Sequence, residues 1–373
     1  MLSGNPLSGA SPRLVIDGRR LTADRTGVGR YLETLLEAWA DTTMPCRDVV
    51  VVLSDRAGLK RIPKVSGLRG LVVAPRLPGL LWERFGLRPV LKDGDVLFAP
   101  SNLIPPNWNG VSILVLFDVM LEARPEDFPW HARLRFRSRY RSSARRASRI
   151  LVPSEATAHD VSRYFGIDPH RMRVIHPSPD PRFQPLLAGA PEVVSARAAI
   201  PGLGDRPFFL FVGKRSRRRH VREILEAFAS IRSEIPGHRL VFVGPVDEKS
   251  KDIGEGAIVA GHVADDVLAG LMASAEALLY PSEYEGFGLP VIEAMASGCP
   301  VITLRRPALV EAGRDGPIYL EEATRESIAG AMREVAMNRD LRADYVKRGL
   351  NASASVRPDE FGDLVREEIM RWM

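Results

Sequence analysis

Residues 277–303, with the sequence ALLYPSEYEGFGLPVIEAMASGCPVIT, constrain the fold of this chain more than any other segment. An apolar run ends at Tyr280-Pro281, and a loop with two glycines leads to Pro290, a residue type that the first turn of a helix tolerates well. Gly298 is typical of the position just after a helix, and a second apolar run follows it. The segment therefore predicts a strand–loop–helix–strand unit. Its loop lies at the carboxyl end of its strand, where doubly wound sheets bind ligands.

Short apolar runs alternate with amphipathic segments along the whole chain, a pattern that indicates parallel sheets covered by helices. A chain of 373 residues usually divides into two domains, and five prolines within 177–191 mark the boundary. The spacing of Phe361, Leu364, Val365 and Ile369 predicts an amphipathic helix at the C-terminus. The expected strands are 14–17, 49–53, 96–99, 112–116, 150–152, 208–212, 240–243, 257–259, 277–279 and 301–303, and the expected helices include 29–39, 127–149 and 221–231.

Two carboxylates bracket the glycine loop of this unit. Glu285 lies in the loop, and Glu293 lies about one turn into the predicted helix. Glycines at 286 and 288 let backbone N–H groups approach a ligand closely, and the helix N-terminus favours an anion such as a diphosphate. Because carboxylates repel phosphates, we expect the two glutamates to bind hydroxyl groups on either side of that anion.

The string E-GFGLPVI-E, followed by AMASGCPVI, resembles the signature of the retaining glycosyltransferases of family 4, which have the GT-B fold. That fold is an α/β architecture of two Rossmann-like parallel-sheet domains that face each other across a cleft. The resemblance implies that Glu285 contacts hydroxyls of a donor sugar and that Glu293 contacts the ribose of the donor nucleotide. The loop residues whose backbone would face the donor are Gly286, Phe287, Gly288 and Leu289.

The resemblance also assigns roles to the parts of the chain. Residues 1–182 form the N-terminal Rossmann-like domain on the acceptor side, and residues 183–356 form the C-terminal Rossmann-like domain that binds the nucleotide sugar. Residues 357–373 form a tail helix that packs back on the N-terminal domain.

A second match to the family lies at residues 212–228, VGKRSRRRHVREILEAF. The family has a strand, a glycine and then an Arg–Lys pair before a helix that ends in EAF. Counting from Gly213 places the pair at Arg218 and Arg219, and the five basic residues within 214–219 leave the register open by one residue. Their charges would hold the donor diphosphate and stabilise the departing nucleotide.

Two N-terminal segments extend the resemblance. Gly27 and Gly29 match the family's glycine loop, which would close over the donor phosphates. Phe117-Asp118 follows an apolar run where many relatives have His-Asp beside the sugar. Asp118 matches and Phe117 does not, so the usual histidine contact is missing at this sugar/acceptor cleft, which leaves the identity of the sugar open.

No metal or resident cofactor is expected. Asp93-Gly-Asp95 has the spacing of a metal-binding D-x-D motif, but it precedes a strand instead of following one. The GT-B pattern uses arginines where the other large glycosyltransferase fold uses a metal ion. The nucleotide-diphosphate sugar is a co-substrate.

The chain has a formal net charge of +6, which fits partners that carry phosphate. A predicted basic helix over Arg133–Arg149 is either a solvated helix near the acceptor side or a patch for anionic lipid headgroups or a lipid diphosphate acceptor. Nucleic acid is disfavoured, because no recognition motif accompanies the arginines. The N-terminus lacks the profile of a signal peptide and the two cysteines form no metal-ligand spacing, so we expect a cytoplasmic protein, peripheral at the inner face of the membrane.

These features predict a retaining, metal-independent hexosyltransferase that uses a nucleotide sugar, with a mannose-like sugar favoured and a saccharide or lipid-linked acceptor, as in polysaccharide biosynthesis. A sugar-nucleotide epimerase or a phosphorylase on the same architecture is an alternative. Another alternative is a non-catalytic nucleotide-sugar or nucleic-acid binder on a degenerate GT-B fold, which the missing histidine and the arginine cluster suggest.

Overall fold

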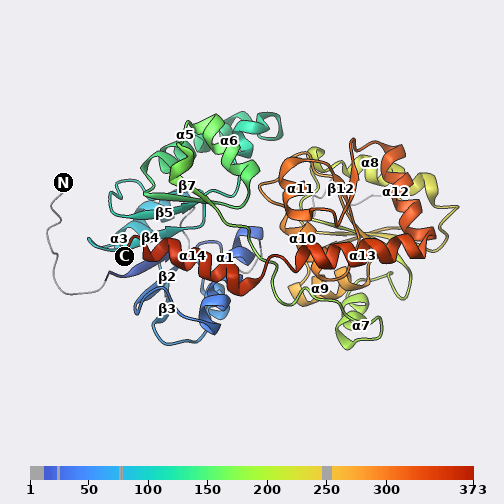
Figure 1. Cartoon of the computed structure of the whole chain (residues 1–373), viewed down its shortest axis with the longest axis horizontal. Helices are drawn as coiled ribbons and strands as arrows, with labels where there is room; N and C mark the ends of the chain where they lie inside the picture. The colour runs from blue at the N-terminus through green and yellow to red at the C-terminus, as the bar shows by residue number, and fades with distance from the viewer. Residues whose placement is uncertain (1–11, 23–25, 75–76, 78, 246–253) are drawn as a thin grey trace.

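A computed structural model describes residues 12–22, 26–74, 77, 79–245 and 254–373. Its core is a pair of all-parallel sheets, one in each half of the chain (Figure 1). The first sheet has the order β3-β2-β1-β4-β5-β6-β7, and the second has the order β10-β9-β8-β11-β12-β13. The first-sheet strands are β1 (Leu14–Asp17), β2 (Val49–Leu53), β3 (Leu68–Val72), β4 (Val96–Ala99), β5 (Ser112–Val115), β6 (Arg149–Val152) and β7 (Met172–Val174). Those of the second are β8 (Phe208–Val212), β9 (Arg239–Val243), β10 (Ala257–Gly261), β11 (Ala277–Tyr280), β12 (Val301–Leu304) and β13 (Ile318–Leu320).

Helices cover both faces of each sheet. Alternate residues of β8 enter two different apolar clusters, with Phe208 and Leu210 on one face and Phe209 and Phe211 on the other. Burial on both faces explains why the strands are continuous apolar runs. In the first domain the helices are α1 (Gly27–Asp41), α2 (Gly79–Trp82), α3 (Arg88–Val90), α4 (Met120–Ala123), α5 (Trp130–Arg146) and α6 (Glu155–Phe165). In the second they are α7 (Pro191–Ala198), α8 (Val221–Ile231), α9 (Asp265–Ser274), α10 (Leu289–Ala296), α11 (Pro307–Gly313), α12 (Arg325–Met337) and α13 (Arg339–Ser353).

The order of the strands creates one binding position in each sheet. In the first sheet the connections leave β1 and β4 in opposite directions, and in the second sheet the same reversal occurs between β8 and β11. At such a reversal the loops diverge and leave a crevice at the carboxyl ends of the strands. The residues that end these strands are therefore expected to face ligands.

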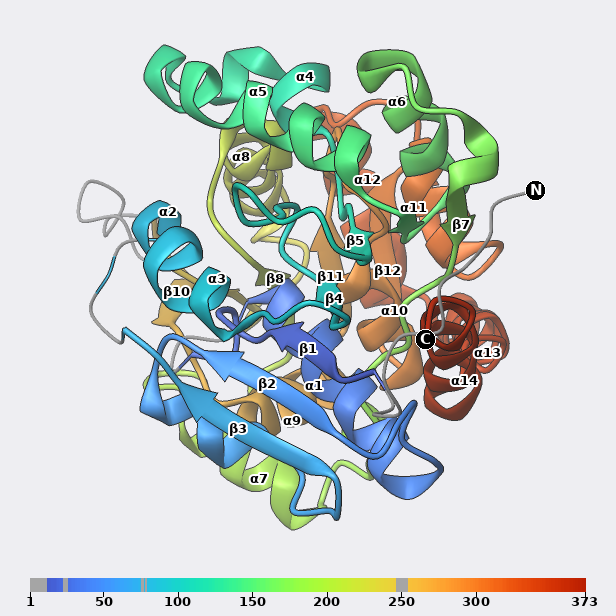
Figure 2. The same cartoon turned by 90° about the vertical axis from the view of Figure 1, so that its left-hand side faces the viewer.

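The last helix, α14 (Pro358–Met370), packs on the first domain although α13 before it packs on the second (Figures 1 and 2). Phe361 lies edge-on to Tyr31 of α1, with ring centroids 5.1 Å apart. The indole N–H of Trp39 donates a 2.8 Å hydrogen bond to the carbonyl of Gly362. The C-terminal helix therefore completes the apolar core of the N-terminal domain.

The predicted architecture of two Rossmann-like domains is confirmed, but one predicted helix was too long. The helix expected over 127–149 begins at Trp130, after Pro129, and ends at Arg146. The backbone N–H of Ser148 then bonds to Ser112 of the neighbouring strand, so Arg149 begins β6. The sequence also missed β3, whose partly exposed strand contains Arg69 and Gly70 instead of an apolar run.

No helix in the described parts of the chain is long and apolar enough to cross a membrane.

Replacing Phe361 by alanine should destabilise the protein by about 3–5 kcal/mol, because the ring is 2% exposed and its removal leaves a cavity between α14 and α1. Urea unfolding followed by circular dichroism measures the change. Met370→Ala is the matched control, since that side chain belongs to the same helix and is 56% exposed. Equal losses in the two variants would contradict a structural role for the Phe361 contact.

Candidate functional site

The two domains share a cleft of about 910 Å³ at the carboxyl ends of both sheets. Arginine and lysine side chains from both domains line this cleft, together with three acidic side chains. The charged residues that line it are Arg30, Arg61, Arg182, Lys214, Arg219, Asp265, Asp266 and Glu285. Gly27, Gly213, Leu289 and Pro290 are among the remaining lining residues. A cleft of this size and charge fits a phosphate-bearing small molecule.

Glu285 is the centre of the hydrogen-bond network in the second domain. One carboxylate oxygen, Oε1, accepts hydrogen bonds from Arg218 Nη1 at 2.6 Å and from Arg219 Nε and Nη2 at 3.1 and 2.9 Å. The hydroxyls of Tyr280 and Ser282 donate to the same oxygen at 2.8 and 2.9 Å. The network therefore joins the loop after β8 to the loop after β11.

The electrostatics of Glu285 follow from these contacts. Burial by itself would raise the pKa of the carboxyl, but the charges of Arg219 and Arg218, together with hydrogen bonds from Arg218 and Tyr280, lower that pKa to about 2. In return, Glu285 and Tyr280 raise the pKa of Arg219 against the opposing effect of burial. Glu285 is therefore an anion, and Arg219 a cation, over the whole physiological pH range.

The glycine after β8 makes room for Arg219. Gly213 has φ +121°, and a Cβ atom at this position would clash with the Arg219 guanidinium. Lys214, the next residue, lines the cleft beside Arg219. Arg218 instead bonds to Ser282 Oγ and to the carbonyl of Tyr284, so it orders the loop that carries Glu285.

Glu293 lies in α10 and is fully buried. Its carboxylate forms an ion pair with Arg30 of α1, with Nε and Oε1 3.0 Å apart. The same guanidinium also lies 3.6 Å from Asp265. Both glutamates were predicted to bind hydroxyls, and the structure provides each with an arginine partner.

The loop between the two glutamates contacts the first domain directly. The carbonyl of Gly286 accepts hydrogen bonds from Ser154 Oγ at 2.6 Å and Thr157 Oγ1 at 2.9 Å. Any side chain at 286 would collide with the carbonyl of Phe117. Gly286 is therefore required for contact between the domains, a role that its position in the glycine loop did not predict.

The other loop residues also contribute to this contact region. The Phe287 ring stacks on His176, with centroids 5.4 Å apart, and His176 bonds to Glu311 at 2.7 Å. The carboxylate of Glu311 caps the N-terminus of α6 by accepting from the backbone N–H groups of Glu155 and Ala156. Gly288 adopts φ +115° as the residue before α10.

Asp118 lies in the first domain, next to Gly286. The Asn102 side chain accepts a 2.9 Å hydrogen bond from the backbone N–H of Phe117, which fixes the turn after β5, and Asp118 accepts from the N–H of Met120 at 2.9 Å. Burial, with a smaller effect of the nearby Glu285 charge, raises the pKa of Asp118 above its usual range. Phe117 packs edge-on against Tyr31, so its ring supports α1.

The two glycines at the start of α1 differ in their surroundings. Gly27 lines the cleft, and nothing lies within 4 Å of a Cβ built on it. A Cβ on Gly29 would meet the backbone oxygen of Arg20 at 2.7 Å, so this glycine lets the loop after β1 pack on the helix. Thr26 caps α1 by accepting from the N–H of Gly29 at 3.2 Å.

Most of the arginines predicted to form a basic patch over Arg133–Arg149 have structural partners. Arg137 and Arg141 pair with Glu122, Arg139 pairs with Glu83, and Arg149 pairs with Glu368. Arg146 donates to three backbone carbonyls. Within the described ranges, Arg133, Arg135 and Arg145 have neither an ion pair nor the carbonyl partners of Arg146.

The described residues contain no group of three His, Cys, Asp or Glu side chains with the geometry of a metal site. Asp95 of the D-x-D string forms an ion pair with Arg13 at 2.6 Å. Its role is therefore to anchor the start of β1.

Several site residues were not predicted from the sequence. Lys214 directly follows Gly213, the glycine after β8, and this position was a usable signal. Tyr280 and Ser282 flank Pro281 beside the signature and could also have been considered. The pairing of Arg30 with Glu293 joins residues 263 positions apart, and no local pattern reveals it.

Two opposed Rossmann-like domains, with a cationic cleft between the carboxyl ends of their sheets, define the GT-B class of glycosyltransferase folds. The model described as "Glycosyltransferase Family 4" matches residues 25–183, and the model described as "Glycosyl transferases group 1" matches residues 196–352. The chain belongs to glycosyltransferase family 4, which confirms the resemblance found in its sequence.

Comparisons with individual proteins agree with this family assignment. The chain is 33% identical to the MMP alpha-(1->4)-mannosyltransferase of Mycolicibacterium hassiacum over 46% of this chain and 41% of that protein. It superposes on WaaG, a glycosyltransferase of lipopolysaccharide biosynthesis, with a TM-score of 0.72 and 17% identity, covering 95% of this chain and 99% of WaaG. Anabaena HepE in complex with UDP-glucose gives a TM-score of 0.72 at 16% identity, covering 96% and 99% of the two chains. The matched region spans less than half of the first curated relatives.

Glu285→Gln should lower the free energy of unfolding by on the order of 3 kcal/mol at pH 7, because it leaves two buried arginines without their counter-ion. The folded pKa is depressed to about 2, so this contribution is complete above the unfolded value near 4.5 and declines as pH falls toward 2. Urea unfolding between pH 8 and pH 3 measures it. The difference between wild type and variant should stay constant above about pH 5 and shrink below it.

Glu226→Gln, at a half-exposed position of α8, is the control and should differ little from wild type at any pH. A difference for Glu285→Gln that grows on acidification would contradict the ion-pair interpretation.

Proposed function

We propose that this chain transfers a hexosyl group from a nucleotide-diphosphate sugar to a saccharide or lipid-linked acceptor, with retention of anomeric configuration and without a metal ion. The observation that carries the proposal is the pairing of Glu285, a permanent anion, with Arg218 and Arg219 where the two sheets face each other. Membership of the family supports the reaction class.

The donor diphosphate would lie against Lys214 and Arg219, which line the cleft, and against the N-terminus of α10. Arg218 is a positioning residue in this scheme, because it holds Glu285 through the loop carbonyl and hydroxyl that it contacts. Glu285 would then orient hydroxyls of the sugar. Hydroxyls of the donor ribose would form hydrogen bonds with Glu293, which pairs with Arg30.

In the transfer step, the bond between the anomeric carbon and the diphosphate oxygen breaks, and a bond from the acceptor oxygen to the same carbon forms. The acceptor's proton moves to the departing phosphate oxygen, so that a glycoside and a protonated nucleotide diphosphate result. Lys214 and Arg219 stabilise the negative charge that develops on the leaving group, the effect that accounts for much of the rate acceleration in such sites.

The identity of the sugar is a finer proposal. A mannosyltransferase among the relatives supports a mannose-like hexose, and the UDP-glucose bound by HepE shows that the same fold accommodates a hexose donor. Phe117 offers no hydrogen bond to the sugar, and its ring packs on Tyr31. Sugar selection would therefore depend on Glu285 and on the loop that presents it.

Arg219→Gln should lower kcat by roughly 10²–10³-fold, because it removes a charge that faces the leaving diphosphate. A panel of UDP- and GDP-hexoses, with release of the nucleotide as the readout, identifies the donor and then measures the loss. Arg222→Gln is the control, since that side chain is 80% exposed on α8. A binder without catalytic function would release no nucleotide from any donor, and that result would refute the proposal.

We also propose that α5 places the protein on an anionic membrane surface. Trp130 and Leu134 are each 73% exposed and lie four residues apart, hence on one side of the helix. Arg133 lies beside them without an ion pair in the described parts of the chain. Exposed aromatic and aliphatic side chains next to cations are typical of helices that lie in the membrane interface.

The double variant Trp130→Ser/Leu134→Ser should weaken binding to vesicles of phosphatidylglycerol and phosphatidylcholine roughly tenfold, because both apolar side chains lose their contact with the lipid. Cosedimentation measures the binding. Leu187→Ser, which replaces an 83% exposed leucine outside α5, is the control. Unchanged binding of the double variant would exclude α5 as the membrane-contacting element.

A further inference from the structure

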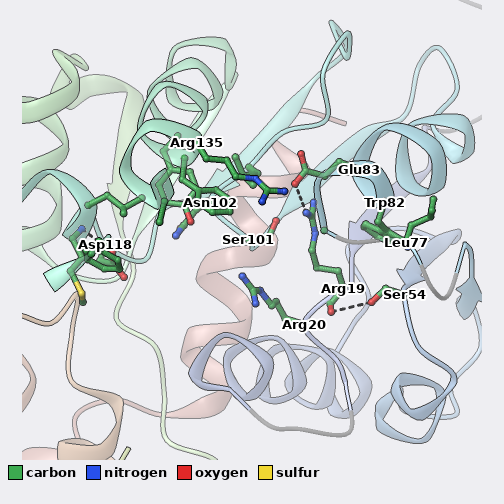
Figure 3. Close-up of a pocket in the computed structure, with 18 residues that line it drawn as sticks. Arg19, Arg20, Ser54, Leu77, Trp82, Glu83, Ser101, Asn102, Asp118 and Arg135 are labelled. Carbon is green, nitrogen blue, oxygen red and sulfur yellow. Dashed lines mark hydrogen bonds and ion pairs between the residues drawn. The ribbon is translucent and has the colours of Figure 1, made fainter. Parts of the chain in front are cut away.

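The first domain contains a second cavity, of about 640 Å³, at the carboxyl ends of β1, β4 and β5 (Figure 3). It lies at the position where the strand order of the first sheet reverses. Ser101 and Asn102 lie after β4, and Asp118 lies after β5. One face of α5 covers the cavity with Ala132, Arg135, Phe136 and Tyr140, whose three- and four-residue spacing places them on the same side. The volume is in the usual range for small-molecule sites.

Two buried acids at the floor of this cavity, Glu83 and Asp17, are already neutralised. Glu83 is fully buried, and its two oxygens pair with Arg19 and Arg139. Asp17, also fully buried, pairs with Arg19 and accepts a 2.7 Å hydrogen bond from Ser101 Oγ. These buried pairs fix the floor of the cavity and leave Glu83 and Asp17 unavailable to further cations.

Two cations of the cavity have no such partner. Within the described ranges, Arg20 and Arg135 form no ion pair, and both side chains are exposed to solvent. Their guanidinium groups come from different elements, the loop after β1 and α5, and Figure 3 shows both turned toward the space beside Ser101 and Asn102. Two free guanidinium groups that converge on one cavity favour an oxyanion, which each binds through paired N–H groups.

We propose that the acceptor is a saccharide that carries an oxyanion, a phosphate or a carboxylate, and that Arg20 and Arg135 bind this group. The inference rests on the proposed glycosyl transfer and names the class of its acceptor. Asp118 lies at the end of the same cavity nearest Gly286 and the donor side. An acceptor held by its anion between the arginines thus directs a hydroxyl toward Asp118 and the anomeric carbon of the donor.

Titration calorimetry on the full chain tests the proposal with hexose 6-phosphate, hexuronic acid and the neutral hexose as probes. Wild type should bind at least one anionic sugar roughly tenfold more tightly than the neutral one, because each charge-assisted hydrogen bond contributes that much. Arg20→Gln and Arg135→Gln should each weaken that binding by a similar factor. Arg145→Gln, an exposed arginine on α5 outside the cavity, should leave it unchanged.

Binding of the phosphate alone identifies a phosphorylated acceptor, binding of the uronate alone identifies an acidic saccharide, and both results support the proposal. Neutral hexose binding as tightly as either anion, equal losses in Arg145→Gln, or no binding of either anion overturns it. UDP and GDP titrations separate this failure from that of the proposed function. If the protein and its two cavity variants bind a nucleotide but no anionic sugar binds, the proposed acceptor class alone is refuted. If the wild type binds neither UDP nor GDP, the transfer reaction itself is refuted.

Discussion

The structure of the site depends on a buried carboxylate that has two arginine partners. A charge removed from water is tolerated only where opposite charges and hydrogen bonds replace its hydration, and Glu285 receives both from Arg218, Arg219 and two hydroxyls. The arginines come from the loop after β8 and the carboxylate from the loop after β11. One ion-pair network therefore fixes the two loops that flank the reversal of strand order. The glycine at 213 is needed because the Arg219 guanidinium occupies the space of its side chain.

Gly286, the residue after Glu285, links the loop that carries this carboxylate to the first domain. Gly286 bonds to Ser154 and Thr157 at the start of α6 and touches the backbone of Phe117. A shift of the Glu285 loop would thus also displace the contacts of Gly286 with the first domain. The C-terminal helix adds a second tie between the domains, because α14 completes the core of the first domain after α13 has packed on the second. Such contacts define how the two binding positions face each other.

Most of the fold could be predicted because buried parallel strands are continuous apolar runs, and because proline and glycine mark the ends of elements such as α10. The signature around Glu285 and Glu293 could be predicted because its chemistry is local in sequence. The partners of these acids could not, since Arg30 lies 263 residues from Glu293 and ion pairing carries no sequence pattern. The arginines of α5 show the same limit. Their number suggested a basic patch, yet Arg139 and its neighbours neutralise buried acids.

The distribution of paired and unpaired cations has a consequence for the chemistry. Both reversal points contain buried acids, but each also keeps cations at a cavity wall: Lys214 and Arg219 in the cleft proposed for the donor, and Arg20 and Arg135 in the cavity proposed for the acceptor. Like charges repel, so two anionic substrates would approach each other closely only if separate cations held their charged groups apart. The acids nearest the junction, Asp118 and Glu285, offer carboxylate oxygens that can accept hydrogen bonds from hydroxyl groups there. Under the proposed reaction, this charge pattern places the charged groups of the two substrates at the flanks and their reacting hydroxyl and anomeric carbon at the centre.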